Sequence, residues 1–224
     1  MTSTEEPLQA HADALRTSLQ SAGLVPGPAA ALLPATADWR PTTQLHVAFG
    51  GKDVELGTFF RAGECKSAKP MVRFGAPASA APLPSAAAAE ATTGQQVKRK
   101  RRKYTFLMID PDAPTPDDPK FAFWRHWVVT GLSPGREAGG GCADAGNDVT
   151  EYLGPGPKDD SKPHRYLFLL YQEPDGMQTL SKADVGGDEF VQRRSFDATT
   201  FATRHGLVLV GMNWMTCAGD GWSE

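Results

Sequence analysis

The sequence has no long apolar run, few cysteines and no basic start. No apolar stretch reaches the roughly 18 residues of a membrane-spanning helix. The first ten residues include two glutamates but no lysine or arginine, which argues against a secretory signal or a basic transit peptide. Cys65, Cys142 and Cys217 form an odd set without metal-ligand spacing. Reduced thiols in a cytoplasmic protein with no required cofactor are therefore expected.

The charge composition also argues against a broad basic surface. The chain carries a net charge of −3, and residues 98–103 alone contribute six positive charges, so the remainder carries −9. Such an acidic body argues against specific binding of nucleic acid. The basic run fits a solvated linker, a nuclear-import stretch or a peripheral contact with an anionic membrane, and the sequence leaves these alternatives open.

Long helical patterns are scarce, whereas turn-forming residues are common. A chain of 224 residues with 40% hydrophobic content can bury one substantial core. Eighteen prolines and 23 glycines favour short strands joined by turns over a helical bundle. Strands are expected over residues 45–49, 54–56, 104–109, 127–129 and 165–171, the first two as a hairpin turning at Gly50 and Gly51.

The two ends of the chain differ from the middle. Residues 1–41 are expected to form an N-terminal extension, with a short amphipathic helix over residues 7–20 and a proline-rich, extended segment over residues 26–41. The helix is indicated by one apolar stripe of Leu8, Ala12, Leu15 and Leu19. Near the other end, Asp197 is expected to cap a helix that stops at Gly206, and Phe196 and Phe201 are expected to form a hydrophobic staple.

One domain is expected over residues 42–217, followed by a tail over residues 218–224. An insertion over residues 75–103 interrupts this domain. Nine alanines lie among residues 76–93, prolines break any helix there, and the basic run follows. Because this segment has no apolar stripe to bury, we expect it to be a disordered loop.

Two short segments combine acids, imidazoles and prolines beside predicted strands. The first is Asp110-Pro111-Asp112-Ala113-Pro114, which leads to Trp124-Arg125-His126-Trp127. The second is Gly154-Pro155-Gly156-Pro157, which leads to Pro163-His164-Arg165-Tyr166. Since strands flank both segments, we expect two carboxylates and two histidines to converge where strands become loops.

These two segments, in their order and spacing, resemble the signatures of the phosphatidylethanolamine-binding protein family. A weaker resemblance extends over residues 42–214, in which residues 206–214 resemble the family's last core strand. The N-terminal extension and short tail resemble the yeast and filamentous-fungal branch, which includes carboxypeptidase Y inhibitors. The resemblance implies a mostly β fold: a β-sandwich in which a large antiparallel sheet packs on a smaller sheet, with peripheral helices. It also implies a cis peptide bond between Ala113 and Pro114.

The resemblance further implies a pocket for a phosphoethanolamine-type head group or phosphate. The family's pocket maps onto Asp110, Asp112, His126, Gly156, Pro157, His164 and Tyr166. Histidine donors, a tyrosine hydroxyl and backbone N–H groups can bind phosphate oxygens. Asp110 would then accept from an ammonium group or orient a histidine, and we expect such a carboxylate to raise the pKa of its histidine neighbour.

Other residues of the two segments have a structural alternative. Asp112 can instead bond to the backbone of its own loop, and Arg165 is expected to pair with Asp110 or Asp112 rather than with a phosphate. Three positions depart from the family pattern. Phe121 stands where a tyrosine is common, and Lys158 and Asp160 stand where proline and glycine are usual.

These residues predict a non-enzymatic regulator that binds a lipid head group or anion. Its expected partner is a serine carboxypeptidase, which it would inhibit, or a signalling kinase or small GTPase. The segments contain no evident activated serine or cysteine nucleophile. Two alternatives are a metal-dependent hydrolase that uses Asp110, His126 and His164, and a kinase or GTPase scaffold that binds no ligand.

Overall fold

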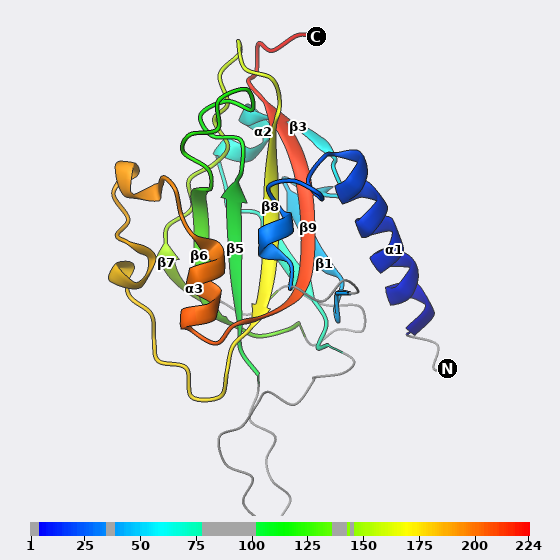
Figure 1. Cartoon of the computed structure of the whole chain (residues 1–224), viewed down its shortest axis with the longest axis vertical. Coiled ribbons are helices and arrows are strands. Elements are labelled where there is room, and N and C mark those ends of the chain that lie inside the picture. Colours follow the sequence, from blue (N-terminus) through cyan, green and yellow to red (C-terminus); the bar gives the residue numbers. More distant parts are fainter. Residues whose placement is uncertain (1–4, 35–38, 78–101, 136–142, 144–145) are drawn as a thin grey trace, which may run out of the picture.

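The computed structural model describes residues 5–34, 39–77, 102–135, 143 and 146–224, which form two packed β-sheets and peripheral helices (Figure 1). The smaller sheet has the strand order β2-β1-β4, and the larger has the order β3-β9-β8-β5-β6-β7. Neighbouring strands of the larger sheet are antiparallel, except that β3 is parallel to β9. The predicted mostly β fold is therefore confirmed.

The smaller sheet begins with the predicted hairpin. β1 (Leu45–Phe49) pairs with β2 (Lys52–Asp53) on one side and with β4 (Met71–Phe74) on the other. The return strand was predicted over residues 54–56, which is wrong. Gly50 and Gly51 both have positive φ and make a two-residue turn, so Phe49 pairs directly with Lys52 and the return strand starts earlier.

The larger sheet is buried on both faces at its centre. Its strands are β3 (Phe59–Arg61), β5 (Tyr104–Asp110), β6 (Trp124–Leu132), β7 (Asn147–Thr150), β8 (His164–Gln172) and β9 (Val208–Ala218). Alternate residues of β5 enter different hydrophobic clusters: Leu107 and Ile109 face the helices, whereas Phe106 and Met108 face the smaller sheet. This two-sided burial explains why β5 and β8 are almost continuous apolar runs.

The N-terminal helix forms over the predicted stretch, as α1 (Glu5–Ser21). Leu15 and Leu19 pack on the larger sheet, and the indole Nε1 of Trp214 donates to Ser18 Oγ at 3.0 Å. The next segment was predicted to be extended, but it turns and forms η1 (Ala30–Leu32). Its apolar side chains enter the same cluster as α1, and their burial favours the observed path.

The remaining helices are short. They are α2 (Ala62–Lys66), η2 (Lys182–Val185), η3 (Phe190–Arg193) and α3 (Ala198–Arg204). α3 has the predicted signals: Asp197 accepts from the Thr200 N–H at 2.9 Å, the rings of Phe196 and Phe201 are 5.4 Å apart, and Gly206 has φ of 62°. No helix in the described part of the chain is both long and apolar enough to cross a membrane.

Several predicted features lie outside the described residues. They include most of the insertion over residues 75–103, four of the six basic residues, and Cys142. The last two basic residues bond to the larger sheet: Arg102 donates to Gln172 Oε1 at 3.0 Å, and Lys103 donates to the Gly131 carbonyl at 3.0 Å. Cys65 and Cys217 are buried free thiols.

Candidate functional site

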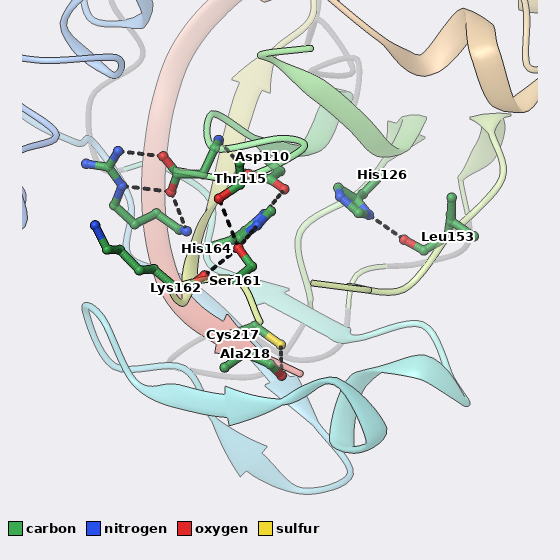
Figure 2. A network of polar contacts seen from close by, with 11 residues as sticks. Asp110, Thr115, His126, Leu153, Ser161, Lys162, His164, Cys217 and Ala218 are labelled. Atoms are coloured by element: carbon green, nitrogen blue, oxygen red, sulfur yellow. Dashed lines mark hydrogen bonds and ion pairs between the residues drawn. The ribbon is translucent and has the colours of Figure 1, made fainter. Parts of the chain in front are cut away.

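The site lies where β5 ends and β8 begins, at adjacent ends of two paired strands. Asp110 is the last residue of β5 and His164 the first of β8. Asp110 Oδ2 is 2.8 Å from His164 Nδ1, and both side chains are only 4% exposed (Figure 2). The other Asp110 oxygen accepts from the Asp112 N–H at 2.6 Å. The predicted convergence of an acid and an imidazole is therefore present.

A serine and a threonine extend this pair beyond the residues that the sequence indicated. His164 Nε2 is 3.1 Å from Ser161 Oγ, and that hydroxyl is 3.3 Å from Thr115 Oγ1 (Figure 2). Both ring nitrogens of His164 consequently have a protein partner. The available sequence signal was small: Ser161 precedes His164 by three residues, in the turn that enters β8.

His126 is close to this group but bonds elsewhere. Its Nδ1 lies 2.7 Å from the Leu153 carbonyl, to one side of the Asp110–His164 pair in Figure 2. The ring of Tyr166 contacts both imidazoles, with centroids 5.1 Å from His126 and 6.4 Å from His164. Since a carbonyl only accepts, Nδ1 carries the hydrogen, and Nε2 of neutral His126 is an acceptor.

Burial dominates the ionisation of His126 and Tyr166. The pKa of His126 is lowered, because loss of solvation outweighs the favourable charge of Asp110. Asp110 acts on the pKa of His126 in the expected direction, but burial has the larger effect, so no net rise occurs at this histidine. Burial, aided by the negative charge of Asp110, raises the pKa of Tyr166 well above its usual value. Neutral imidazole and neutral phenol are thus the favoured forms near neutral pH.

Buried Asp112 and half-buried Arg165 form a clamp between the loop after β5 and the start of β8, as predicted for Arg165. Arg165 Nη2 donates to Asp112 Oδ1 at 2.6 Å, and Arg165 Nε donates to Oδ2 at 2.9 Å. Arg165 Nη1 also donates to the Ala22 carbonyl at 3.0 Å, next to the end of α1. The loop between Asp112 and β6 contains the predicted cis bond between Ala113 and Pro114. Both Asp112 oxygens bond to Arg165, which favours the structural role for this carboxylate.

The Gly-Pro-Gly-Pro segment directly follows Leu153, whose backbone bonds to His126. The Leu153 N–H donates to the His126 carbonyl at 2.9 Å, so the backbone before Gly154 runs beside β6. A Cβ on Gly154 would lie 2.9 Å from Lys66 Cα, which explains a glycine there. Pro157 is buried and Gly156 is exposed, so Gly156 has a solvent-facing backbone and Pro157 a packed ring.

The structure shows the environment of the three residues that depart from the family pattern. The Arg194 guanidinium lies over the ring of Phe121, 4.2 Å from its centroid. Lys158 and Asp160 are exposed. Between them, Asp159 Oδ1 accepts from the Gly221 N–H at 3.0 Å, so the C-terminal tail holds this loop.

Two buried arginines stabilise the opposite side of β6. Arg193 Nη1 donates to the carbonyls of His126 at 3.1 Å and Glu151 at 2.9 Å. Arg125 Nε donates to Thr150 Oγ1 at 2.8 Å, and burial lowers its pKa to about 10. These donors fix the strand that positions His126, and sequence reasoning missed them because their acceptors are mainly backbone carbonyls.

The geometry does not support the metal-dependent alternative. Within the described ranges, no group of three or more His, Cys, Asp or Glu side chains is arranged to hold a metal ion. Asp110 and His164 bond to each other, while His126 Nδ1 bonds to the Leu153 carbonyl. The chemistry available is therefore that of a small polar cluster with acceptors, a phenol and two hydroxyls.

Comparisons with known proteins give a consistent result. The family model described as phosphatidylethanolamine-binding protein matches residues 68–210. Protein MOTHER of FT and TFL1 homolog 2 of Oryza sativa subsp. japonica is 34% identical over 111 residues, covering 50% of this chain and 57% of that protein. Putative odorant-binding protein A5 of Drosophila melanogaster is 43% identical over 87 residues, covering 36% and 39%. The chain thus matches about half the length of these relatives, or less.

Solved structures share the fold over most of the chain. The carboxypeptidase Y inhibitor, crystallised with its cognate proteinase, has a TM-score of 0.67 at 23% identity, and the match covers 95% of this chain and 97% of that one. The phosphatidylethanolamine-binding protein of Plasmodium vivax has a TM-score of 0.59 at 19% identity, with coverage of 91% and 97%. Similarity at these identities is similarity of fold.

Proposed function

The chain belongs to the phosphatidylethanolamine-binding protein family, and from this we propose that it is a regulator that binds an amine-bearing phosphate head group. The observation that carries the proposal is the buried cluster at the ends of β5 and β8. The cluster is at most 3% exposed at each of Asp110, His164 and Tyr166. His164 bonds to Asp110, and its ring stacks with the ring of Tyr166. Buried polar groups in such a cluster favour a small ligand with matching donors and acceptors.

The chemistry of the cluster favours a ligand that carries both signs of charge. Asp110 and the Nε2 atom of neutral His126 are acceptors, which suits the ammonium group of ethanolamine. The Tyr166 hydroxyl and the backbone N–H of Gly156 are donors, which suits a phosphate oxygen. Inorganic phosphate alone would use only the donors, so we expect phosphoethanolamine to bind more tightly.

Calorimetric titration of phosphoethanolamine, ethanolamine and inorganic phosphate tests this proposal. We expect wild-type protein to bind phosphoethanolamine at least roughly tenfold more tightly than phosphate, since one charge-assisted hydrogen bond contributes about 1.5–3 kcal/mol. His126→Gln and Asp110→Asn should weaken this preference. Asp117→Asn, which changes an exposed ion pair with Lys162, is the matched control and should bind normally. A folded wild-type protein that binds none of the three compounds contradicts the proposal.

We propose inhibition of a serine carboxypeptidase as the finer regulatory role. Its support is the fold shared with a carboxypeptidase Y inhibitor over nearly the full length of both chains. Deleting the N-terminal extension is a poor test, because Leu15, Leu19 and Leu24 belong to the core. Reversing the charge of Arg16 and adding a negative charge at Gln20, both exposed on α1, leave that core intact.

An inhibition assay with purified serine carboxypeptidase tests this role directly. We expect inhibition by the wild-type chain and weaker inhibition by a variant that combines Arg16→Glu with Gln20→Glu, with an unchanged circular dichroism spectrum. Asp175→Lys, on an exposed loop far along the chain, is the control. If the folded wild-type protein does not inhibit the enzyme, the inhibitory role is contradicted, whereas the proposal of head-group binding is unaffected.

A further inference from the structure

Ser161 completes a hydrogen-bonded series with His164 and Asp110 that the binding role does not require. The two distances are 3.1 Å from Ser161 Oγ to His164 Nε2 and 2.8 Å from His164 Nδ1 to Asp110 Oδ2. The three residues are all buried, at 6%, 3% and 2% exposure. We propose that Ser161 is a reactive nucleophile, with His164 as its general base and Asp110 as the group that orients the imidazole.

The hydrogen-bond roles follow from the partners of Asp110. An ionised carboxylate only accepts, and one Asp110 oxygen already accepts from the Asp112 N–H. The hydrogen of neutral His164 therefore lies on Nδ1, facing Asp110 Oδ2. Nε2 then carries the lone pair, and it faces the Ser161 hydroxyl. A nucleophile, a base and an orienting acid stand in this relation in serine hydrolases, which are recognised by geometry rather than by sequence order.

The local structure holds the serine in place. The Ser161 N–H donates to the Lys158 carbonyl at 3.1 Å, which closes the turn before β8. Ser161 Oγ also lies 3.0 Å from the Lys162 carbonyl, so its hydrogen has three possible acceptors, which are this carbonyl, Thr115 Oγ1 and His164 Nε2. Thr115 Oγ1 lies 3.3 Å from Ser161 Oγ. Its hydroxyl is thus placed to donate to the carbonyl oxygen of a substrate whose carbonyl carbon Ser161 attacks.

The expected reaction is acyl transfer from a small ester. Ser161 Oγ attacks the ester carbonyl while its proton moves to His164 Nε2. The bond from the carbonyl carbon to the alcohol oxygen then breaks, and the leaving alcohol takes that proton. The product is an acyl ester on Ser161, which water can hydrolyse with His164 again as the base. The small exposed fraction of Ser161 restricts the substrate to short acyl groups.

A fluorophosphonate probe tests the nucleophile without assuming a natural substrate. Attack by Ser161 forms a phosphorus–oxygen bond and releases fluoride, and the adduct is located by mass spectrometry of peptides. We expect labelling at Ser161 in the wild-type chain and no label there in Ser161→Ala. Asp110→Asn should slow labelling at least roughly 100-fold, because it removes the group that orients the imidazole.

Control variants distinguish labelling of an activated serine from labelling of any exposed serine and from damage to the fold. Ser67→Ala changes an exposed serine that has no hydrogen bond to a histidine in the described part of the chain, and it should label at the wild-type rate. Thr115→Val should slow labelling less than Asp110→Asn. Circular dichroism and urea titration of Ser161→Ala should match wild type, which distinguishes loss of the nucleophile from loss of the fold. If Asp110→Asn does not fold, the comparison between wild type and Ser161→Ala still decides the question.

Two results would overturn the proposal. One is a folded wild-type protein that the probe does not label. The other is a label confined to serines other than Ser161. If Ser161 is labelled, release of p-nitrophenol from p-nitrophenyl acetate should also be faster with wild type than with Ser161→Ala, and equal rates would contradict acyl transfer by this serine.

Discussion

At the scale of single residues, the two aspartates of the Asp110-Pro111-Asp112 run have separate duties. Asp110 faces His164 and thereby sets the hydrogen position on its ring. Asp112 bonds to the backbone N–H of Arg165 at 2.7 Å and to two atoms of its guanidinium, so it joins the two loops of the site. Neighbouring carboxylates in one motif therefore have different partners, an imidazole for Asp110 and a guanidinium for Asp112.

Arg165→Lys tests the structural duty. Lysine keeps the charge but cannot make the bidentate contact with Asp112, whose carboxylate is buried. We expect the free energy of unfolding to fall by about 1–3 kcal/mol in urea titrations, the range for hydrogen bonds to charged groups. Lys162→Ala breaks the exposed pair with Asp117 and should change stability by less than about 1 kcal/mol. Equal effects of the two substitutions would contradict the clamp.

The pH dependence of stability should report the burial of His126. Its pKa is lower in the folded than in the unfolded protein, so the unfolded chain binds more protons below the ordinary value of about 6.5. Stability contributed by neutral His126 is complete above about pH 6.5 and is lost as pH falls below it. Burial also lowers the pKa values of His11 and His46, which add to the same slope.

Comparing His126→Asn with wild type isolates this contribution. The Asn amide can still donate to the Leu153 carbonyl but does not titrate. Between about pH 5 and pH 6.5, we expect the slope of unfolding free energy against pH to decrease by up to about 1.4 kcal/mol per pH unit. His46→Asn should reduce the slope less, because His46 is less buried. An unchanged slope in His126→Asn would show that folding does not lower the pKa of this imidazole.

At the scale of elements, local signals determine α3 better than they determine the N-terminal extension. The Asp197 cap, the Phe196–Phe201 contact and Gly206 act within one short stretch, and all three were predictable from the residues. The segment after α1 has no such signals. Its path depends on packing against the larger sheet, which a proline count cannot reveal.

The same distinction applies to the site. Its two segments, its cis peptide bond and the role of Arg165 could be predicted, because each belongs to a recognisable local motif. The contact between Asp110 and His164 was also expected, but its extension to Ser161 could not be predicted. It depends on β5 lying next to β8 and on the turn that brings the serine hydroxyl back to the imidazole. The two-residue hairpin at Gly50 and Gly51 was placed correctly, but its register required the pairing of the strands.

Asp197→Ala should destabilise the protein through α3. The substitution leaves the Thr200 N–H and hydroxyl without their acceptor, and loss of an N-cap costs about 0.5–2 kcal/mol. These bonds lower the pKa of Asp197, so the difference from wild type should shrink as pH falls below about 4. Urea titrations at neutral and acidic pH measure both effects. Asp175→Ala, at an exposed loop position, should change stability little at either pH.

At the scale of the whole molecule, Asn213 joins the two sheets through a buried amide. From β9 of the larger sheet, its Nδ2 donates to the carbonyls of Leu45 and Val54 at 3.0 Å each. Its Oδ1 accepts from the Trp214 N–H at 2.8 Å. Hydrophobic contacts between the sheets are not directional, whereas the hydrogen bonds of this amide specify the position of β1 relative to β9.

Asn213→Ala should therefore weaken the whole fold rather than one edge. The substitution leaves two buried carbonyls without these donors, and we expect a loss of about 2–4 kcal/mol in unfolding free energy. Fluorescence and circular dichroism should report a single shifted transition. Asn147→Ala, at the exposed start of β7, is the control and should stay within about 0.5 kcal/mol of wild type. Separate transitions for the two probes would show that the sheets unfold independently.

The strand order also constrains how the protein is made. β9 is the last strand along the chain, yet it lies between β3 and β8 in the larger sheet. A ribosome that has synthesised the chain only as far as Leu207 therefore exposes a partly built sheet, in which β3 and β8 each lack a neighbour. Such edges can pair with other chains. The nascent protein is thus expected to need protection from aggregation until residues 208–218 have left the ribosome exit tunnel, and to become protease-resistant only then.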